Sequence, residues 1–178
     1  MAAFPKKIIL RPIQPDDRVS QFSLGKPEYA PLKTFLTRHA KSYHQEDIAK
    51  TFVLVEHGIE KPPVLGYITL ICSEIECASN AAIEANKYNR SPAVKIARLA
   101  VHQDSQNNYY GRTLIQWAIA NVIENILPNT GCRFLVVDSK KSSVQYYEKR
   151  GFTLLDTDSN RKNDHPVLFI DLHKLQLV

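Results

Sequence analysis

Two short apolar runs separated by one amphipathic segment constrain the fold most. VKIARLAV (Val94–Val101) and CRFLVVDS (Cys132–Ser139) are rich in β-branched residues and too short to span a membrane, so each predicts a buried strand. Between them, Arg112–Leu127 repeats apolar residues at helical spacing, and Pro128 and Gly131 end the helix. The order strand, helix, strand predicts a β-α-β crossover.

The loop that enters the predicted helix has the composition of an anion-binding turn. It reads HQDSQNNYYG (His102–Gly111). N–H groups in the first turn of a helix have no intrahelical partner and carry partial positive charge, which favours a phosphate there. The loop matches neither G-x-G-x-x-G nor the P-loop pattern, which argues against a dinucleotide fold and an NTPase.

Three segments in this region resemble the Gcn5-related N-acetyltransferase (GNAT) superfamily. Arg98–Val101 (RLAV) is similar to the family's fourth strand, Gln106–Gly111 (QNNYYG) to its Q/R-x-x-G-x-G/A loop, and Tyr146–Phe152 (YYEKRGF) to its F-Y-x-x-x-G-F segment. The resemblance implies an α/β (α+β) GNAT fold. Such a fold has a mixed, mostly antiparallel central sheet, flanking helices and a β-α-β core that binds acetyl-CoA.

The resemblance also implies acetyl-CoA as co-substrate, without a metal, and a set of residues that bind it. These residues are Leu99, Ala100, Val101, Gln106, Asn107, Asn108, Tyr109, Tyr110, Gly111 and Arg112. Tyr109 stands where the family usually has its first loop glycine, so we expect an altered backbone approach to the phosphates. Taken alone, the loop also fits an ordinary β-α-β core in which Gly111 only eases a turn.

Tyr147 is the predicted catalytic residue, because the resemblance places the family's tyrosine there, at the CoA sulfur. A phenol with a pKa near 10 holds its proton at neutral pH and can protonate the departing thiolate. Tyr146, whose family equivalent is usually Phe, is predicted to pack. Backbone N–H groups at Leu99–Val101 are candidates to stabilise the carbonyl oxygen.

No general base stands out in the sequence. The residues considered are His102, Glu74 and Glu76, and each is expected to be an ordinary surface group. An α-amino group has a pKa near 8, so an aminoacyl ester can attack without a base, whereas a lysine acceptor needs more help.

The N-terminal half has a narrower resemblance, to the GNAT toxins of toxin–antitoxin pairs. The matching segments are Phe22–Glu28 (FSLGKPE), Phe35-Leu36 with Ala40, Thr51–Val55 (TFVLV) and Leu65–Tyr67 (LGY). Leu24 replaces the usual Cys, and Ala30 stands near the usual Asp. This resemblance implies acetylation of aminoacyl-tRNA, which blocks translation, and a small DNA-binding antitoxin as partner. The alternatives are a GNAT enzyme acting on a small-molecule or protein amine, and a non-catalytic GNAT-fold binding protein.

The charge balance bears on the acceptor. The chain has a formal net charge of +5 and a sequence pI of about 9.1, which suit a polyanionic partner. Lys33, Arg38 and Lys41 are spaced to lie near one another on or just after the first predicted helix, and we predict that they bind the acceptor. Modest basic charge is common and CoA is itself anionic, so charge alone does not identify tRNA.

Length and composition predict one domain, residues 1–178, in the cytoplasm. No apolar run is long enough to span a bilayer, so no membrane partner is expected, and the N-terminus has no recognisable export signal. Cys72, Cys77 and Cys132 are expected to be reduced thiols in the core. A homodimer is left open.

The other segments are expected to complete the same sheet. The predicted strands are Lys6–Ile13, Thr51–Glu56, Val64–Ile75, Phe152–Leu155 and Val167–Leu172. The predicted helices are Glu28–Ala40 and Ser142–Arg150, while Ala78–Pro92 is expected to be a helix or loop and Asp156–Asp164 a charged loop.

Overall fold

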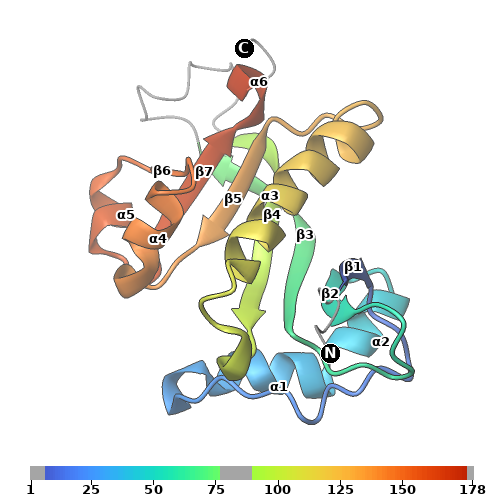
Figure 1. The fold of residues 1–178 in the computed structure, drawn as a ribbon. Helices are drawn as coiled ribbons and strands as arrows, with labels where there is room; N and C mark the ends of the chain where they lie inside the picture. Colours follow the sequence, from blue (N-terminus) through green and yellow to red (C-terminus); the bar gives the residue numbers. More distant parts are fainter. Residues whose placement is uncertain (1–6, 77–89, 176–178) are drawn as a thin grey trace. The chain divides into compact units, whose positions relative to one another are not determined.

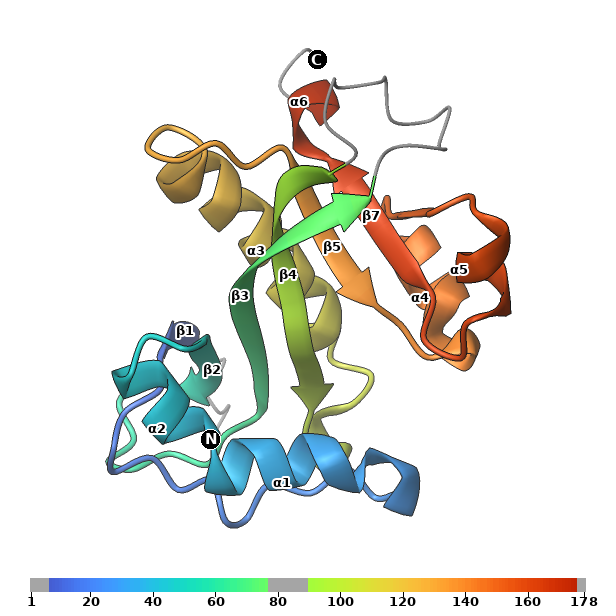
Figure 2. The same ribbon diagram turned by 180° about the vertical axis from the view of Figure 1, so that it is seen from behind.

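The computed structural model describes residues 7–76 and 90–175, and its strands form a seven-stranded sheet in the order β1-β2-β3-β4-β5-β7-β6 (Figures 1 and 2). The strands are β1 (Ile8–Pro12), β2 (Lys50–Glu56), β3 (Gly66–Glu76), β4 (Arg90–Val101), β5 (Phe134–Asp138), β6 (Thr153–Leu154) and β7 (Val167–Asp171). β4 pairs with β5 in parallel, while β1 with β2, β2 with β3, β5 with β7 and β6 with β7 are antiparallel. The predicted mixed, mostly antiparallel α/β fold is confirmed.

Helices connect these strands. They are η1 (Pro27–Tyr29), α1 (Ala30–Arg38), α2 (Ala40–Gln45), η2 (Gln103–Ser105), α3 (Tyr110–Asn121), η3 (Val122–Ile126), η4 (Lys141–Ser143), α4 (Val144–Glu148), α5 (Asp158–Lys162) and α6 (Leu172–Leu175). α3 continues into η3, a π-helical turn, so the predicted helix over Arg112–Leu127 is present. None of the helices in the described residues is both long enough and apolar enough to cross a bilayer.

The predicted β-α-β crossover is present. Ala93–Ile96 of β4 lie in register with Phe134–Val137 of β5, and α3 connects the two strands. The apolar stripe of α3 is buried at Leu114, Ile115 and Ala118, as its helical spacing requires.

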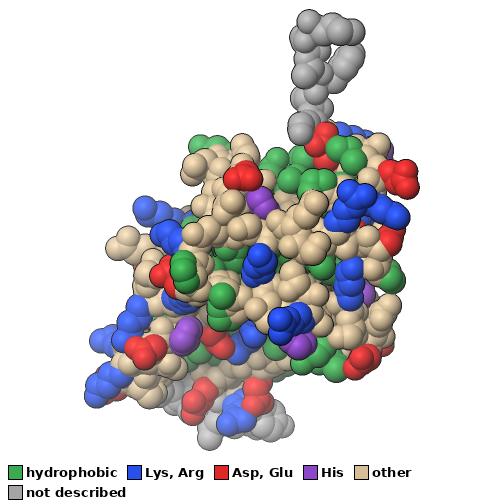
Figure 3. Space-filling view, turned by 90° about the horizontal axis from the view of Figure 1, so that it is seen from below, with side chains coloured by type: hydrophobic (Ala, Val, Ile, Leu, Met, Phe, Trp, Pro, Cys, Tyr) green, Lys and Arg blue, Asp and Glu red, His purple; other side chains and the backbone are tan. Residues whose placement is uncertain are grey.

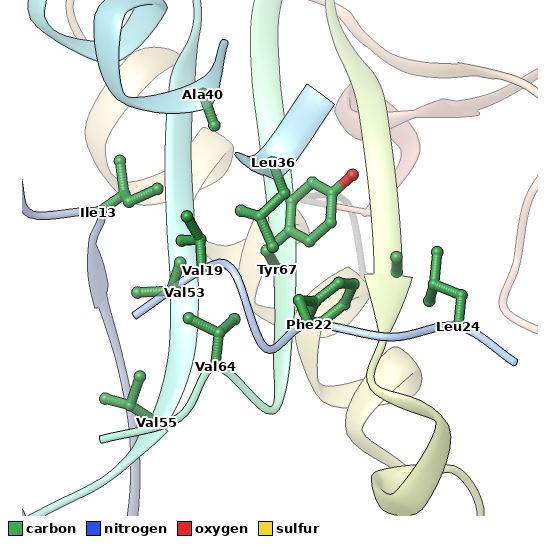
Figure 4. Close-up of a cluster of buried hydrophobic side chains, with 11 residues drawn as sticks. Ile13, Val19, Phe22, Leu24, Leu36, Ala40, Val53, Val55, Val64 and Tyr67 are labelled. Atoms are coloured by element: carbon green, nitrogen blue, oxygen red, sulfur yellow. The ribbon is translucent and has the colours of Figure 1, made fainter. Parts of the chain in front are cut away.

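The chain divides into two compact units, residues 1–70 with 98–114, and residues 71–97 with 115–178. The first unit has a core that includes Phe22, Leu36, Val53, Tyr67 and Ala100 (Figure 4). The Tyr67 ring lies edge-on to Phe22 at 5.6 Å, and its hydroxyl donates to the Leu32 carbonyl at 2.7 Å. Residues quoted for the toxin resemblance therefore also build the core. The prediction of a single domain stays a prediction.

The second unit has its own core on the other strands. Phe134 and Phe169 meet edge-on at 5.8 Å, together with Ile75, Ala93 and Leu155. Beside them, Arg133 donates two hydrogen bonds, of 3.1 and 2.8 Å, to the buried carboxylate of Asp171. Figure 2 shows β4, β5 and β7 from the side opposite to α3.

Several predicted boundaries are wrong. The predicted helix Glu28–Ala40 ends at Arg38, and a second helix, α2, follows it. Of the segment Ala78–Pro92, residues 78–89 lie outside the described residues, but Arg90–Pro92 are strand, because β4 begins four residues before the predicted Val94. The predicted loop Asp156–Asp164 contains α5, whose first turn is capped by the Thr157 hydroxyl accepting from the Asn160 amide. Cys132 is buried as predicted, but Cys72 is exposed on β3, so its predicted core position is wrong, and Cys77 lies outside the described residues.

Candidate active site

The first unit contains the strand and loop that the sequence assigns to acetyl-CoA. β4 ends at Val101, with Ala100 buried in the core and Leu99 and Val101 half-buried. The His102 amide donates to the Leu65 carbonyl at 2.8 Å, which fixes the point where the chain leaves the sheet. The turn η2 and the exposed residues 106–109 then lead into α3.

The backbone of this loop presents a run of free donors. Across residues 7–76 and 90–175, none of the amides from Asn107 to Arg112 donates a hydrogen bond, and the first α3 amide that does is that of Thr113, to the Tyr109 carbonyl at 3.1 Å. Asn107 and Tyr109 both have positive φ, of 73° and 59°. Backbone in which left-handed and helical residues alternate turns successive N–H groups to one side and forms an anion-binding concavity. The segment therefore has the donors that a pyrophosphate needs.

Tyr109, at the position of the family's first loop glycine, has a left-handed backbone conformation. Its φ of 59° is unusual for a residue with a side chain and costs about 1–2 kcal/mol. Its side chain is 77% exposed, so the ring projects into solvent and does not fill the loop. The altered backbone approach to the phosphates that we expect at this position stays a prediction.

Two of the predicted loop residues belong to the helix. Tyr110 and Gly111, with Arg112, form the first turn of α3, which begins two residues earlier than predicted. Gly111 is helical and is not among the glycines with positive φ, so easing a turn is not its role. Its amide remains one of the first-turn donors that have no intrahelical acceptor.

His102 has a structural role. Its Nδ1 accepts from the Asp104 amide at 3.3 Å, and its Nε2 lies 3.3 Å from the Gln21 carbonyl. With Nδ1 accepting, Nε2 carries the proton and donates to Gln21. The ring also meets Phe22 edge-on at 5.6 Å. Both nitrogens are engaged, which agrees with the expectation that His102 is not the general base.

The second unit contains Tyr147, the predicted catalytic residue. It lies on α4, is 8% exposed, and meets Tyr146 and Phe152 edge-on at 5.3 and 5.4 Å. Burial, followed by the neighbouring Tyr146, raises the pKa of Tyr147 above its ordinary value of 10. The phenol therefore holds its proton at physiological pH and is available as an acid.

The Tyr-Tyr-x-x-x-Gly-Phe spacing has a local physical explanation. The Tyr147 carbonyl accepts from the amides of Arg150 and Phe152 at 2.8 and 3.2 Å, which closes the end of α4. Gly151, between these donors, has a φ of +88°, a left-handed conformation typical of a helix C-terminus. The turn brings Phe152 back onto the Tyr147 ring and fixes the orientation of that ring.

Tyr146 has the contacts of a packing residue, as predicted. Its half-buried ring lies 3.4 Å from the Arg150 guanidinium carbon, and its carbonyl accepts from the same guanidinium. The Arg150 Nε is buried and has no hydrogen-bond partner among the described residues.

The three predicted acceptor-binding residues do not form one set of free cations. Lys33 and Arg38 are exposed on α1. Lys41 lies on α2, and its ammonium donates to the carbonyls of Pro15 and Asp17 at 2.7 and 2.8 Å. Lys41 thus fastens the segment that follows β1. The contacts join groups 24 and 26 residues apart, which sequence spacing does not reveal.

The other two general-base candidates, Glu74 and Glu76, are surface groups, as expected. Glu74 pairs with Arg90, and Glu76 is exposed at the end of β3.

Sequence reasoning missed a hollow in front of α1, lined by Lys26 and Tyr29 among others. The unusual Gly25-Lys26-Pro27 sequence before the helix was the available signal.

A family model described as an acetyltransferase (GNAT) domain matches residues 25–174. The chain belongs to the GNAT acetyltransferase family. The reaction class is therefore acyl transfer to an acceptor, as predicted, and the residues assigned to each role stay predictions. No curated protein sequence matches the chain.

Solved structures with similar folds include GNAT toxins. The AtaT toxin with a tyrosine-to-phenylalanine substitution has a TM-score of 0.79 at 24% identity, over 99% of this chain and 97% of its own. AtaT complexed with acetyl-methionyl-tRNAfMet gives 0.81 at 24% identity, over 96% and 98%. A tyrosine-to-phenylalanine variant of KacT gives 0.82 at 24% identity, over 97% and 99%. The likeness extends over nearly the whole length of both chains.

Proposed function

We propose that this GNAT acetyltransferase transfers the acetyl group of acetyl-CoA to the amino group of an aminoacyl-tRNA and so acts as a translation-blocking toxin. The observation that carries the proposal is the full-length fold likeness to AtaT complexed with acetyl-methionyl-tRNAfMet, at a TM-score of 0.81. Family membership supplies the acetyltransferase chemistry independently of that likeness.

The loop before α3 supports a role in binding acetyl-CoA. The backbone amides of Asn107–Arg112 donate no hydrogen bond within the described residues, so several N–H groups are available to a pyrophosphate. The partial positive charge at the N-terminus of the twelve-residue helix α3 also favours an anion there. AtaT has also been solved bound to acetyl-CoA and the C-terminus of the antitoxin AtaR. We propose that Leu99–Val101 and Gln106–Arg112 bind acetyl-CoA in this chain.

Acetyl-CoA supplies an activated acyl group as a thioester. Transfer forms a carbon–nitrogen bond from the acceptor amine to the acetyl carbonyl carbon and breaks the carbon–sulfur bond. We propose that the Tyr147 hydroxyl donates its proton to the departing sulfur, and that the proton lost by the amine restores the phenol through solvent. Backbone N–H groups at Leu99–Val101 are proposed to stabilise the carbonyl oxygen.

The acceptor chemistry explains why a general base is dispensable. The α-amino group of an amino acid esterified to tRNA has a pKa near 8, so an appreciable fraction of it is neutral at physiological pH. This agrees with the structural use of both nitrogens of His102. We propose Lys33 and Arg38 for contact with the acceptor, with Lys41 acting by holding the segment at Asp17.

Partners and location follow from this proposal. Charged tRNA and acetyl-CoA meet in the cytoplasm, where we place the protein. A similar chain has been solved in a KacTA–DNA complex. It matches 96% of the present chain with a TM-score of 0.76 and 24% identity. We propose a small DNA-binding antitoxin as the partner of this protein too.

The test is acetylation of total charged tRNA with labelled acetyl-CoA. We expect label on the aminoacyl moiety, released by mild alkali with the ester, and none on uncharged tRNA. Label on polyamines or free amino acids, with charged tRNA unmodified, would replace the proposal with a small-amine acetyltransferase. Failure to bind acetyl-CoA in calorimetry would replace it with a non-catalytic binding protein.

A further inference from the structure

A hollow of about 310 Å³ lies in front of α1, within the first unit. The turn Ser23–Pro27 forms one part of its wall, and Tyr29, Ala30 and Lys33 form the rest. Ligand cavities in proteins begin at about 300 Å³, so the hollow suits a group as large as one nucleotide.

The wall of the hollow is fastened to the segment that leads into the cofactor loop. The Gln103 amide donates to the Ser23 carbonyl at 2.8 Å, and the Ser23 hydroxyl donates to the Gln103 side-chain carbonyl at 3.1 Å. Gly25 has a φ of +73°, and a Cβ at that position would lie 3.0 Å from the same Gln103 oxygen. The positive φ favours glycine in this turn, and the two hydrogen bonds to Gln103 give the hollow a fixed place relative to η2.

The side chains around the hollow are cationic and aromatic. Lys26 and Lys33 are exposed and form no ion pair with any described residue. The half-buried Tyr29 ring packs against the core of the first unit, and its hydroxyl is hydrogen-bonded to the carboxylate of exposed Glu28. Figure 3 shows the molecule from the side on which α1 lies in Figure 1, with Lys and Arg side chains spread over this face.

Basic groups that follow a phosphate backbone, combined with an aromatic ring for stacking, are the means by which proteins bind single-stranded nucleic acid. We propose that the hollow binds the single-stranded 3′ end of the acceptor RNA, with Lys26 and Lys33 at backbone phosphates and Tyr29 against a base. The inference rests on the proposed function and names a binding site within it. Ser23 and Gln103 position that site beside the cofactor segment.

The first experiment measures two affinities of the full chain by calorimetry. The probes are a single-stranded RNA oligonucleotide that ends in CCA, and acetyl-CoA. For Lys26→Glu combined with Lys33→Glu, we expect the Kd for RNA to rise at least tenfold and its salt dependence to become shallower by about one unit of log–log slope. The Kd for acetyl-CoA should change less than twofold.

A matched control separates local binding from net charge. Lys7→Glu combined with Lys162→Glu makes the same charge change at exposed positions outside the hollow, and should lose far less RNA affinity. Tyr29→Phe should bind RNA as the wild type does, because it keeps the ring, whereas Tyr29→Ala should bind about tenfold more weakly. Thermal melting of each variant verifies that it is folded.

Each contrary result has a defined meaning. If both charge-reversed proteins lose RNA affinity equally, the hollow is not the site and general electrostatics explain the binding. If the Lys26 and Lys33 variant loses acetyl-CoA affinity instead, the phosphate bound there belongs to CoA, and the inference is wrong. If the wild type acetylates charged tRNA and these variants keep its KM for tRNA, only the hollow is refuted. If the wild type acetylates no charged tRNA, the proposed function itself fails.

Discussion

Gly66 of β3 lies directly against the end of β4 that we assign to acetyl-CoA. A Cβ at position 66 would lie 3.2 Å from the Ala100 carbonyl oxygen, 3.4 Å from a Leu114 methyl carbon and 3.6 Å from the Val101 Cα. Two of these atoms belong to the backbone of β4, so they cannot move aside by rotation of a side chain. Gly66→Ala must displace the strand by a few tenths of an ångström.

The magnitude follows from two opposed contributions. Overpacking a filled site costs about 1–3 kcal/mol, while replacing a glycine in a strand recovers about 0.5–1 kcal/mol of backbone entropy. The expected net loss for Gly66→Ala is centred on about 1 kcal/mol and is at most about 2.5 kcal/mol; a loss of about 1 kcal/mol lowers Tm by about 2–4 °C in a protein of this size. Since Ala100 and Val101 are displaced, the Kd for acetyl-CoA should rise by about threefold or more, ~0.7 kcal/mol.

Two other glycines make the comparison a controlled one. A Cβ at Gly131 would meet no atom within 4 Å, and Gly131 is not among the residues with positive φ, so Gly131→Ala should be neutral or slightly stabilising. Gly58 also has open space but a φ of +83°, so Gly58→Ala should lose about 1–2 kcal/mol through strain alone, with acetyl-CoA affinity unchanged. Thermal melting and calorimetry measure both quantities. If Gly66→Ala melts and binds acetyl-CoA as Gly131→Ala does, the packing argument is refuted.

Three further predictions concern the site and its support. Tyr147→Phe should lower kcat by 10²–10⁴-fold with little change in the KM for acetyl-CoA, and Tyr146→Phe should stay active in the same assay; equal activity of both would make Tyr147 a packing residue. Gly111→Val should raise the Kd for acetyl-CoA at least tenfold, ~1.4 kcal/mol, in calorimetry, and an unchanged Kd in a folded variant would move the pyrophosphate elsewhere. Burial acts to raise the pKa of Asp17, but the Arg11 hydrogen bonds of 2.6 and 2.9 Å, with help from the Gln14 amide, outweigh it and hold that pKa below its usual value. The ionised carboxylate thus stabilises the fold above about pH 4, and this stabilisation is lost as the pH falls. In denaturant titrations, Asp17→Asn should be less stable than the wild type at pH 7 and approach it at acid pH. A difference in unfolding free energy that stays constant with pH would exclude the ion pair as its cause.

The parts of the fold that the sequence predicts are those set by local periodicity. The apolar runs Val94–Val101 and Cys132–Ser139 identified β4 and β5, because a parallel strand that is buried on both faces needs a continuous apolar run. The amphipathic segment between the two runs identified the crossover. The spacing of Tyr147, Gly151 and Phe152 is also local, since one turn of chain determines it.

The features that escaped prediction depend on distant contacts. Asn160 is buried in α5, and its side-chain amide donates to the carbonyls of Leu155 and Val167 while accepting from the Val167 amide. Polar composition suggested a loop there because the partners lie outside the segment. The early start of α3 escaped prediction for a different reason: Tyr109, directly before it, takes a left-handed conformation that its residue type disfavours.

The exposed ring of Tyr109 gives the cofactor loop a natural chemical label. At 77% exposure it is far more open to reagents than Tyr43, at 37%, while Tyr67 and Tyr147 are buried. Among the tyrosines that the structure describes, mild nitration or iodination should therefore mark Tyr109 first, and mass spectrometry would measure the extent of labelling peptide by peptide. Occupancy of the loop by a pyrophosphate could then be followed as protection of a single tyrosine, without any substitution in the chain.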